Sequence, residues 1–346
     1  MAITEVAYCT RADVQRALNF ADSPRLNERV DSAVMAGARD LEGALHRKFY
    51  PETKTVEFDM PDDEHLWLYE NELAAAPTLI MSGGAPMTVD FDVLLRPKSG
   101  PPYRWLEARF GGDVYWQAEG TVQNAIAITG VFHYPVKQIT VTGLAAQVAA
   151  GDDTIIVLDS SRCGPGSLIL LGSERLIVSD ATLEQTGASL AADAGTAKSD
   201  TQLTVDDGTL INAGELLWIE GERLFVTAVA GDTVVVDRAV NASTLAGHTS
   251  GTLIYAPREL TVLRGELGTE PADHDDTVPV ILLKAPSLIS ELNLALAINN
   301  TQQALSAYAR PVGAADTQRD QVGRGVQDIM TDAMTTYGRQ YRGRAI

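Results

Sequence analysis

An internal repeat constrains the fold of this 346-residue chain more than any other feature of its sequence. The stretch GSLILLGSERLIV (166–178) aligns with GELLWIEGERLFV (214–226) at a shift of 48 residues, and DTIIVLDSS (153–161) matches DTQLTVDDG (200–208) at a shift of 47. Apolar and polar residues alternate in each copy, with glycines between the runs, which predicts strand, loop, strand, tight turn and strand. Two copies are too few for a solenoid. We therefore expect two small β modules in tandem.

The segments before the repeat show two different periodicities. Residues 53–143 alternate with a period of two, as in MTVDFDVLL, and turns rich in Gly and Pro separate the runs, so we expect antiparallel strands there. Near the N-terminus, a capping-box pattern at Thr10 predicts a short helix. A second helix begins at Pro24, and its apolar residues recur every three or four positions up to about residue 48.

A further helix is expected after Pro286, with apolar residues on two faces; Leu294, Ile298 and Leu305 share one of these faces. Such a helix has to pack on two sides. Because helices lie at both chain ends, we predict an α+β fold: a helical bundle formed by the N- and C-terminal segments, with an antiparallel β region and an inserted tandem-repeat all-β domain. The expected divisions are N-terminal helices (1–52), antiparallel β region (53–143), inserted repeat domain (144–257), β return segment (258–285) and C-terminal helices with a basic tail (286–346).

The chain is acidic, with a formal net charge of -19. Residues 144–257 hold 15 acidic and 5 basic residues, which is about half of the excess. Proteins that grip a phosphate backbone are usually basic, so this charge argues against tight nucleic-acid binding. No apolar run reaches the roughly 18 residues that span a bilayer, and the N-terminus lacks a signal-peptide pattern, so no membrane partner is expected. Cys9 and Cys163 predict unpaired thiols in a reducing compartment.

Motifs that usually mark catalysis or metal binding are weak in this chain. None of the five histidines pairs with another at metal-ligand spacing, and the DHDD stretch (273–276) is more typical of a polar turn. Cys163 has no nearby base to activate its thiol, and the glycine pairs of SGGAP and FGGD lack the lysine of a phosphate loop. We therefore expect no enzyme activity, no catalytic or metal site and no cofactor.

Two stretches rich in basic and aromatic residues are candidate sites. The first lies where the second helix gives way to the β region, and it could be an active site, a phosphate contact or a joint in a larger assembly; the helix dipole alone also explains basic residues in a last turn. It comprises His46, Arg47, Lys48, Phe49 and Tyr50. The second is a C-terminal tail, which is short for a nucleic-acid arm and is typical either of a peptide that docks on an acidic protein or of a solvated tail. It comprises Tyr337, Arg339, Tyr341, Arg342 and Arg344.

Several motifs, in this order and spacing, resemble the head–tail connector (adaptor) proteins of long-tailed bacteriophages. YCTRADVQRALNF is similar to the opening helix of that family, and RLNERVDSAVMAGARDLEGALHRKFYP to its second helix and following joint. NAIAITGVFHYP resembles its last β-hairpin strand, and QQALSAYARP followed by GVQDIMTDAMTTYGRQYRGR resembles its closing helices and tail. The resemblance covers residues 8–143 and 286–344. Residues 136–285 depart from it, because family members pass almost directly from that strand to the third helix.

The resemblance implies a structural virion protein, made in the host bacterial cytoplasm, that forms a dodecameric ring at the head–tail junction. Its implied partners are the portal protein, the next tail-completion (stopper) protein or tail tube, and further copies of itself. Genomic DNA would pass through the channel without sequence-specific binding. The tail, Tyr337, Arg339, Tyr341, Arg342 and Arg344, would engage the portal. Residues 46–50 would be a joint, and Leu294, Ile298 and Leu305 would face the next subunit.

A binding module is the alternative interpretation of the repeat region. Glycan sites usually need exposed aromatic side chains, and the region offers Trp218 and Tyr255. In that case the repeats would bind glycan or decorate the virion surface or tail, and the helices would serve as an anchor.

Overall fold

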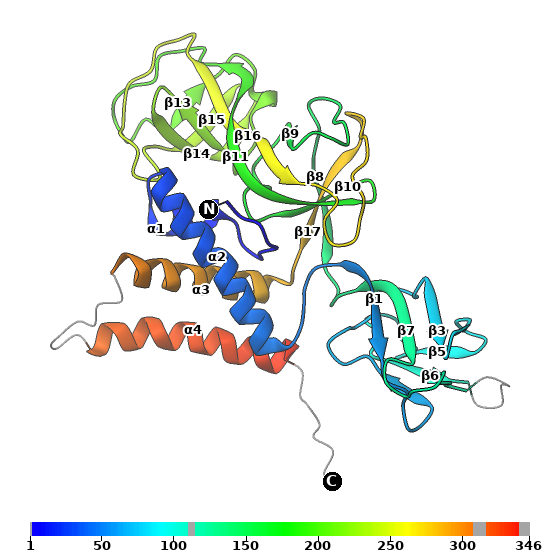
Figure 1. The fold of residues 1–346 in the computed structure, drawn as a ribbon. Helices are drawn as coiled ribbons and strands as arrows, with labels where there is room; N and C mark the ends of the chain where they lie inside the picture. Colours follow the sequence, from blue (N-terminus) through cyan, green and yellow to red (C-terminus); the bar gives the residue numbers. More distant parts are fainter. Residues whose placement is uncertain (1, 110–114, 307–315, 339–346) are drawn as a thin grey trace. The chain divides into compact units, whose positions relative to one another are not determined.

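The structure, a computed structural model, describes residues 2–109, 115–306 and 316–338 (Figure 1). Contacts within the chain divide it into two compact units. Unit 1 consists of Met1–Leu41, Gln138–Glu266 and Glu270–Asp332, and unit 2 of Glu42–Lys137, Leu267–Thr269 and Ala333–Ile346. The helices are α1 (Arg11–Leu18), α2 (Pro24–Leu45), α3 (Ser287–Leu305) and α4 (Asp316–Tyr337). Unit 1 thus combines the repeat region with helices from both chain ends, and unit 2 is built around the β region that follows α2.

Unit 1 is built on a ten-stranded sheet in the order β12-β15-β14-β13-β16-β11-β10-β17-β8, with β9 paired to β16. Two of its strands, β11 and β16, are long and pair with each other from Ile177 opposite Leu263 to Ser189 opposite Leu253. The strands are β8 (Lys137–Gly143), β9 (Thr154–Ile156), β10 (Leu168–Leu171), β11 (Glu174–Ser189), β12 (Gln202–Thr204), β13 (Leu216–Ile219), β14 (Glu222–Ala230), β15 (Thr233–Asp237), β16 (Leu253–Leu263) and β17 (Pro279–Lys284). A short 3-10 helix, Gly208–Leu210, follows β12.

The two β modules are nested, and the predicted tandem arrangement is wrong. The outer module comprises residues 144–178 and 259–284, and the inner module, residues 190–256, is inserted between its two parts. Equivalent strands make equivalent pairs: β10 pairs with β11 and β17 in the outer module, and β13 pairs with β14 and β16 in the inner module. Likewise β16 pairs with β9 in the outer module, and β15 pairs with β12 in the inner one.

Strand register also corrects the shift of 47 inferred for the first strand of each module. Ile155 of β9 lies opposite Leu260, and Leu203 of β12 lies opposite Val234, so Ile155 is equivalent to Leu203 at a shift of 48. Both residues are buried. A slip of one residue would turn the exposed Gln202 into the core, because successive side chains of a strand point to opposite faces.

A buried charge cluster closes the outer module. The carboxylate of Glu174, only 1% exposed, accepts hydrogen bonds from the guanidinium of Arg264 at 2.6 and 2.7 Å. It also accepts one from the ring of His274 at 2.7 Å and two from the backbone N–H groups of Gly265 and Ala272. These donors replace the water that a buried carboxylate would otherwise need.

The inner module repeats this cluster atom for atom. Glu222, at 0% exposure, accepts hydrogen bonds from Arg238 at 3.0 and 2.6 Å and from His248 at 2.9 Å. The backbone N–H groups of Ala239 and Ala246 complete it. In both modules the histidine follows the arginine by ten residues. The two glutamates are 48 positions apart, whereas the two arginines, like the two histidines, are 26 positions apart. The difference arises because the inner module is inserted between the glutamate of the outer module and its arginine and histidine.

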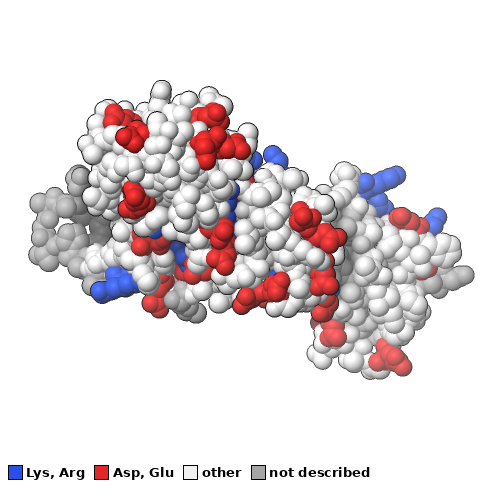
Figure 2. Space-filling view, turned by 90° about the horizontal axis from the view of Figure 1, so that it is seen from above, with Lys and Arg blue, Asp and Glu red and all other residues white. Residues whose placement is uncertain are grey.

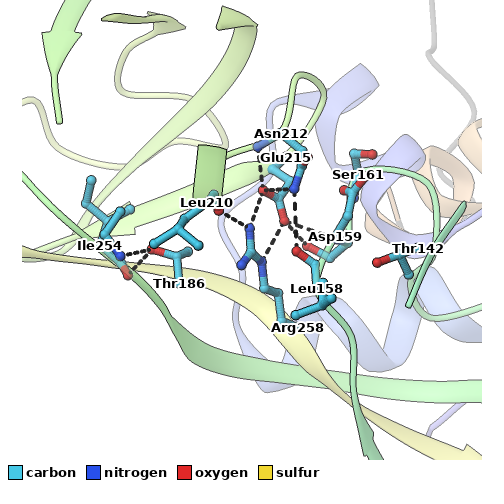
Figure 3. A network of polar contacts seen from close by, with 12 residues as sticks. Thr142, Leu158, Asp159, Ser161, Thr186, Leu210, Asn212, Glu215, Ile254 and Arg258 are labelled. Carbon is cyan, nitrogen blue, oxygen red and sulfur yellow. Dashed lines mark hydrogen bonds and ion pairs between the residues drawn. The ribbon is translucent and has the colours of Figure 1, made fainter. Parts of the chain in front are cut away.

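A third buried carboxylate joins the two modules (Figure 3). Glu215 of the inner module binds Arg258, which lies on β16 between the modules, at 2.9 and 2.7 Å. The same carboxylate accepts hydrogen bonds from the N–H and hydroxyl groups of Ser160 in the outer module at 3.0 and 3.2 Å. The outer module has Ser167 at the equivalent position. The repeats therefore differ at the position where they are connected.

The predicted helical bundle of the two chain ends is wrong, because the described residues are 35% strand and 21% helix and α1 is attached to the sheet. The guanidinium of Arg11 pairs with Asp31 of α2 and with Asp180 of β11, both at 2.6 Å. The backbone N–H of Arg11 donates a hydrogen bond to the carbonyl oxygen of Pro165. A side chain at Gly166 would lie 2.6 Å from the carbonyl oxygen of Cys9, so the N-terminal segment packs tightly on the turn before β10.

Helix α3 contacts α2 and the N-terminal segment around one buried amide. The side chain of Asn293 accepts hydrogen bonds from the backbone N–H groups of Tyr8 and Cys9 and donates to the carbonyl of Val34. A Cβ atom at Gly37 of α2 would lie only 3.0 Å from that amide nitrogen, which explains the glycine on the apolar stripe of this helix. Three segments of unit 1 therefore converge on a polar side chain at 0% exposure.

Unit 2 packs two small antiparallel sheets around one core. Their orders are β1-β7-β3-β4 and β2-β6-β5. The strands are β1 (Glu52–Phe58), β2 (His65–Trp67), β3 (Leu79–Ser82), β4 (Ala85–Pro86), β5 (Val93–Arg96), β6 (Trp105–Ala108) and β7 (Ile126–Phe132). Residues that alternate along these strands, such as Leu66, Leu106, Ile126 and Ile128, are buried in a shared cluster. This agrees with the period of two in the sequence.

Removing the carboxylate of the inner cluster should be costly. In Glu222→Leu, Arg238 remains buried without its partner, and we expect the free energy of unfolding of the inner module to fall by about 3–5 kcal/mol. The double variant Glu222→Leu/Arg238→Met removes both charges and should lose less. Denaturation combined with hydrogen exchange of the β14 amides measures both; a double variant as unstable as the single one would contradict this role.

The outer cluster should make stability depend on acid pH. Burial alone would raise the pKa of Glu174, but hydrogen bonds from Arg264, His274 and two backbone N–H groups lower the pKa from 4.5 to about 2. Such a group stabilises the fold above its unfolded pKa, and this stabilisation is lost as the pH falls through its folded pKa. Between pH of about 4.5 and about 2, Glu174→Gln should therefore lose less stability than the native chain. Denaturation across this range, with the exposed Glu270→Gln as control, measures the difference.

Candidate functional site

The joint, residues 46–50, lies between α2 and β1 in unit 2 (Figure 1). Helix α2 ends at Leu45, and His46 adopts a left-handed conformation with φ of 51°. A left-handed residue directly after a helix turns the chain away from the helix axis. The next residues therefore run into β1 rather than continuing the helix.

Arg47 is the centre of this joint. Its side chain, 8% exposed, binds the carboxylate of Glu72 through two hydrogen bonds of 3.1 and 3.0 Å. Its guanidinium lies 4.8 Å from the ring centroid of Tyr134 and donates a hydrogen bond to the carbonyl oxygen of Tyr337, the last residue of α4. The planar guanidinium can make all these contacts at once because its donors point in several fixed directions.

Three aromatic rings surround this arginine contact. Phe49, Tyr134 and Tyr337 meet pairwise edge to face, with ring centroids 5.6, 5.8 and 5.6 Å apart. Edge-to-face pairs place the positive ring edge against the negative ring face. The backbone N–H of Tyr134 also donates to the carbonyl of Lys48. The end of α4 is thereby attached to the joint and to the residues that follow β7.

The remaining residues of the joint lie nearer the surface or pack below it. The Lys48 ammonium lies 3.2 Å from Glu52 and 5.4 Å from the Tyr50 ring centroid. Burial would lower the pKa of Lys48, but Tyr50 and Glu52 outweigh it and raise the pKa. The ring of His46 lies 3.6 Å from the carboxylate of Glu70, which is half exposed. Tyr50 is buried.

The structure brings together two of the sites that the sequence presents separately. Tyr337, expected to belong to a portal-binding tail, contacts Phe49 and Arg47, which were expected to form a joint. The rest of that tail lies outside the described residues: Arg339, Tyr341, Arg342 and Arg344. The proposed intersubunit residues of α3 belong to unit 1; Leu294 and Ile298 are partly buried, and Leu305 is 39% exposed.

Glu72 and Tyr134 are parts of the joint that sequence reasoning missed. Tyr134 lies in the FHYP motif, whose place after an expected strand could have suggested a fixed aromatic contact. Glu72 follows several other acidic residues, and nothing in its local sequence distinguishes it. It is nevertheless only 2% exposed, and Arg104 also lies 3.6 Å from it.

The residues that the sequence offered as catalytic candidates are buried or paired inside unit 1. His274 of the DHDD stretch binds Glu174 inside the outer module. Cys163 and Cys9 are buried and both line a cleft of about 840 Å³ in unit 1. Burial, with a smaller contribution from Asp159 and Glu215, raises the pKa of Cys163 to about 12, and burial also raises that of Cys9. Both thiols are therefore protonated at neutral pH and are poor nucleophiles.

Within the described part of the chain, no three His, Cys, Asp or Glu side chains are placed to hold a metal ion. None of the helices in residues 2–109, 115–306 and 316–338 is long and apolar enough to cross a membrane. No protein-family model, curated protein or solved structure matches this chain.

Replacement of Arg47 should loosen the end of α4. Arg47→Lys keeps the charge but loses the paired hydrogen bonds to Glu72, and hydrogen bonds to charged groups contribute about 1.5–3 kcal/mol each. We expect a loss of that order in the stability of unit 2 and faster hydrogen exchange near Tyr337. Arg104→Lys is the matched control, because Arg104 faces the same carboxylate but is 53% exposed. Equal effects of the two variants would contradict the role given to Arg47.

Proposed function

We propose that this protein is a structural subunit of the head–tail junction of a long-tailed bacteriophage, where copies of it form a ring between the portal and the tail. The proposal starts from the ordered motifs in residues 8–143 and 286–344 that resemble the connector family. Residues 144–285 lie outside that resemblance and fold into the nested modules, so the resemblance does not support a role for the modules.

The observation that carries the proposal is the distribution of apolar side chains around α3. One face is buried in unit 1, and it comprises Ile289, Leu292, Asn293, Ala297 and Thr301. Leu294, Ile298 and Leu305 lie off that face and are partly exposed, with Leu305 the most exposed at 39%. A helix that is apolar all round needs cover on more than one side. Identical subunits arranged head to tail in a closed ring provide such cover.

The joint supports a second part of the proposal, the engagement of the portal by the C-terminal tail. Tyr337 is attached to Arg47, Phe49 and Tyr134, so the tail starts from a defined point in unit 2. The residues after it include Arg339, Arg342 and Arg344. Arginine makes paired hydrogen bonds with carboxylates, which suits an acidic docking site on the portal.

The charge of the chain is compatible with DNA passage. On the face in Figure 2, acidic side chains are scattered and basic ones form smaller groups. A wall of net negative charge would leave a duplex mobile, because a basic wall binds it through counterion release. A channel lined by lysine and arginine in the assembled ring would contradict this part of the proposal.

The glycan-binding alternative receives less support. Trp218 lies opposite Tyr255 in the sheet, and both are partly exposed. However, the guanidinium of Arg223 lies 5.0 Å from the Trp218 ring centroid, and it is itself held by Asp22. The arginine therefore occupies a ring face that a sugar would need.

Assembly should depend on the exposed side of α3. We expect native mass spectrometry of the full chain, alone and with a portal protein, to show a ring, and Leu305→Asp to reduce or abolish it because a charge there is incompatible with a buried contact. Leu253→Asp, at a leucine of similar exposure (43% against 39%) on β16, should leave assembly unchanged. A single protomer in both native samples would overturn the proposal.

A further inference from the structure

A segment of unit 2 beside the joint exposes several acidic and aromatic side chains. This acceptor segment, residues 62–70, has the following exposed members: Asp62, Asp63, Glu64, Trp67, Tyr69 and Glu70. Trp67 is 49% and Tyr69 is 63% exposed. Exposed aromatic groups are enriched at protein interfaces, whereas single exposed residues need no explanation. The combination with four carboxylates indicates a surface for a basic partner.

The exposed indole of Trp67 packs against a second indole. Trp67 of β2 pairs with Trp105 of β6, and the ring centroids lie 4.9 Å apart. Arg96 of β5 is next in the same row, and its guanidinium is occupied by Glu107 at 2.7 Å. The alternate residue Leu66 is buried in the core beneath. The two indoles therefore lie side by side on the outer face of the sheet β2-β6-β5.

The acceptor segment ends beside the joint. The carboxylate of Glu70 lies 3.6 Å from the ring of His46, and Glu72, two residues later, binds Arg47. Arg47 in turn donates to the carbonyl oxygen of Tyr337. The chain therefore leaves the described structure, after residue 338, in the neighbourhood of the acceptor segment and within the same unit.

We propose that the acceptor segment binds residues 339–346 of the same chain. This segment contains Arg339, Arg342 and Arg344 and no acidic residue. Arginine pairs with carboxylates and stacks on indole faces, so it complements both components of the acceptor segment. Eight extended residues reach at most about 28 Å. The attachment at Tyr337 favours the same chain, because a short tether gives an effective concentration in the millimolar range.

One consequence concerns regulation and rests on the proposed function. If the same arginines engage the portal, docking on the acceptor segment and portal binding exclude each other. The tail would then be held on its own subunit until an acidic portal surface competes for it. The docking itself does not depend on a portal and can be measured on the isolated full-length chain.

Trypsin provides the test, because it cleaves after arginine. The acceptor variant Asp62→Asn/Glu64→Gln/Glu70→Gln removes three exposed carboxylates. It retains Asp63, whose carboxylate accepts a hydrogen bond from the backbone N–H of His65. We expect cleavage after Arg339, Arg342 and Arg344 to be roughly threefold to tenfold faster in this variant, since exposed ion pairs contribute up to about 1 kcal/mol each. Trp67→Ala should change the rates in the same direction.

The control variant Asp153→Asn/Asp275→Asn/Asp276→Asn removes the same charge from exposed residues of unit 1 and should leave the rates unchanged. Slow cleavage after the buried Arg47 shows that each variant is folded. Unchanged rates in the acceptor variant, or equal acceleration in the control variant, would overturn the proposal. Protection that is lost on dilution of the native chain would assign the docking to a second copy and would overturn the same-chain assignment. None of these outcomes depends on whether a ring forms.

Discussion

A buried carboxylate held by an arginine, a histidine and two backbone N–H groups is the interaction on which the β part of unit 1 depends. It occurs as Glu174 in the outer module and as Glu222 in the inner one. Each cluster connects the start of one strand to the loop after another, so it ties together segments that are remote in sequence. Its donors must all be present, since an unpaired buried charge is strongly destabilising.

The same kind of contact recurs throughout the chain. Buried pairs of arginine and carboxylate also attach α1 to α2, join the two modules and hold the end of α4 at the joint. Because each pair is neutral, these contacts leave the net charge of -19 to the remaining, mostly exposed residues. Several arginines are thus buried inside the units, whereas the C-terminal tail adds three arginines to a chain whose net charge is negative. That contrast motivates both the portal contact and the docking on the acceptor segment.

Local sequence signals were reliable where one residue pattern implies one structure. The capping box at Thr10, the strands of residues 53–143 and the helix after Pro286 are present in the structure. The position of the joint after the second helix was also predictable, because basic and aromatic residues break the helical pattern there. Its partners Glu72 and Tyr134 were not, since side chains that meet across 25 or more positions leave no local pattern. The helical bundle was wrong because periodicity identifies an apolar helix face but not what covers it.

The sequence by itself determined that two copies of one β module exist, that helices lie at both chain ends and that the chain is acidic. Periodicity, repetition and composition are local properties, and they can be read without knowledge of contacts. Only the tertiary structure decided that the inner module is inserted into the outer one, since nesting moves the arginine and histidine half of the repeat to a shift of 26. The tertiary structure also decided that α1 is attached to the sheet through the ion pair of Arg11 with Asp180, and that Tyr337 packs on the joint through its ring contact with Phe49. Both contacts join residues that are remote in the sequence.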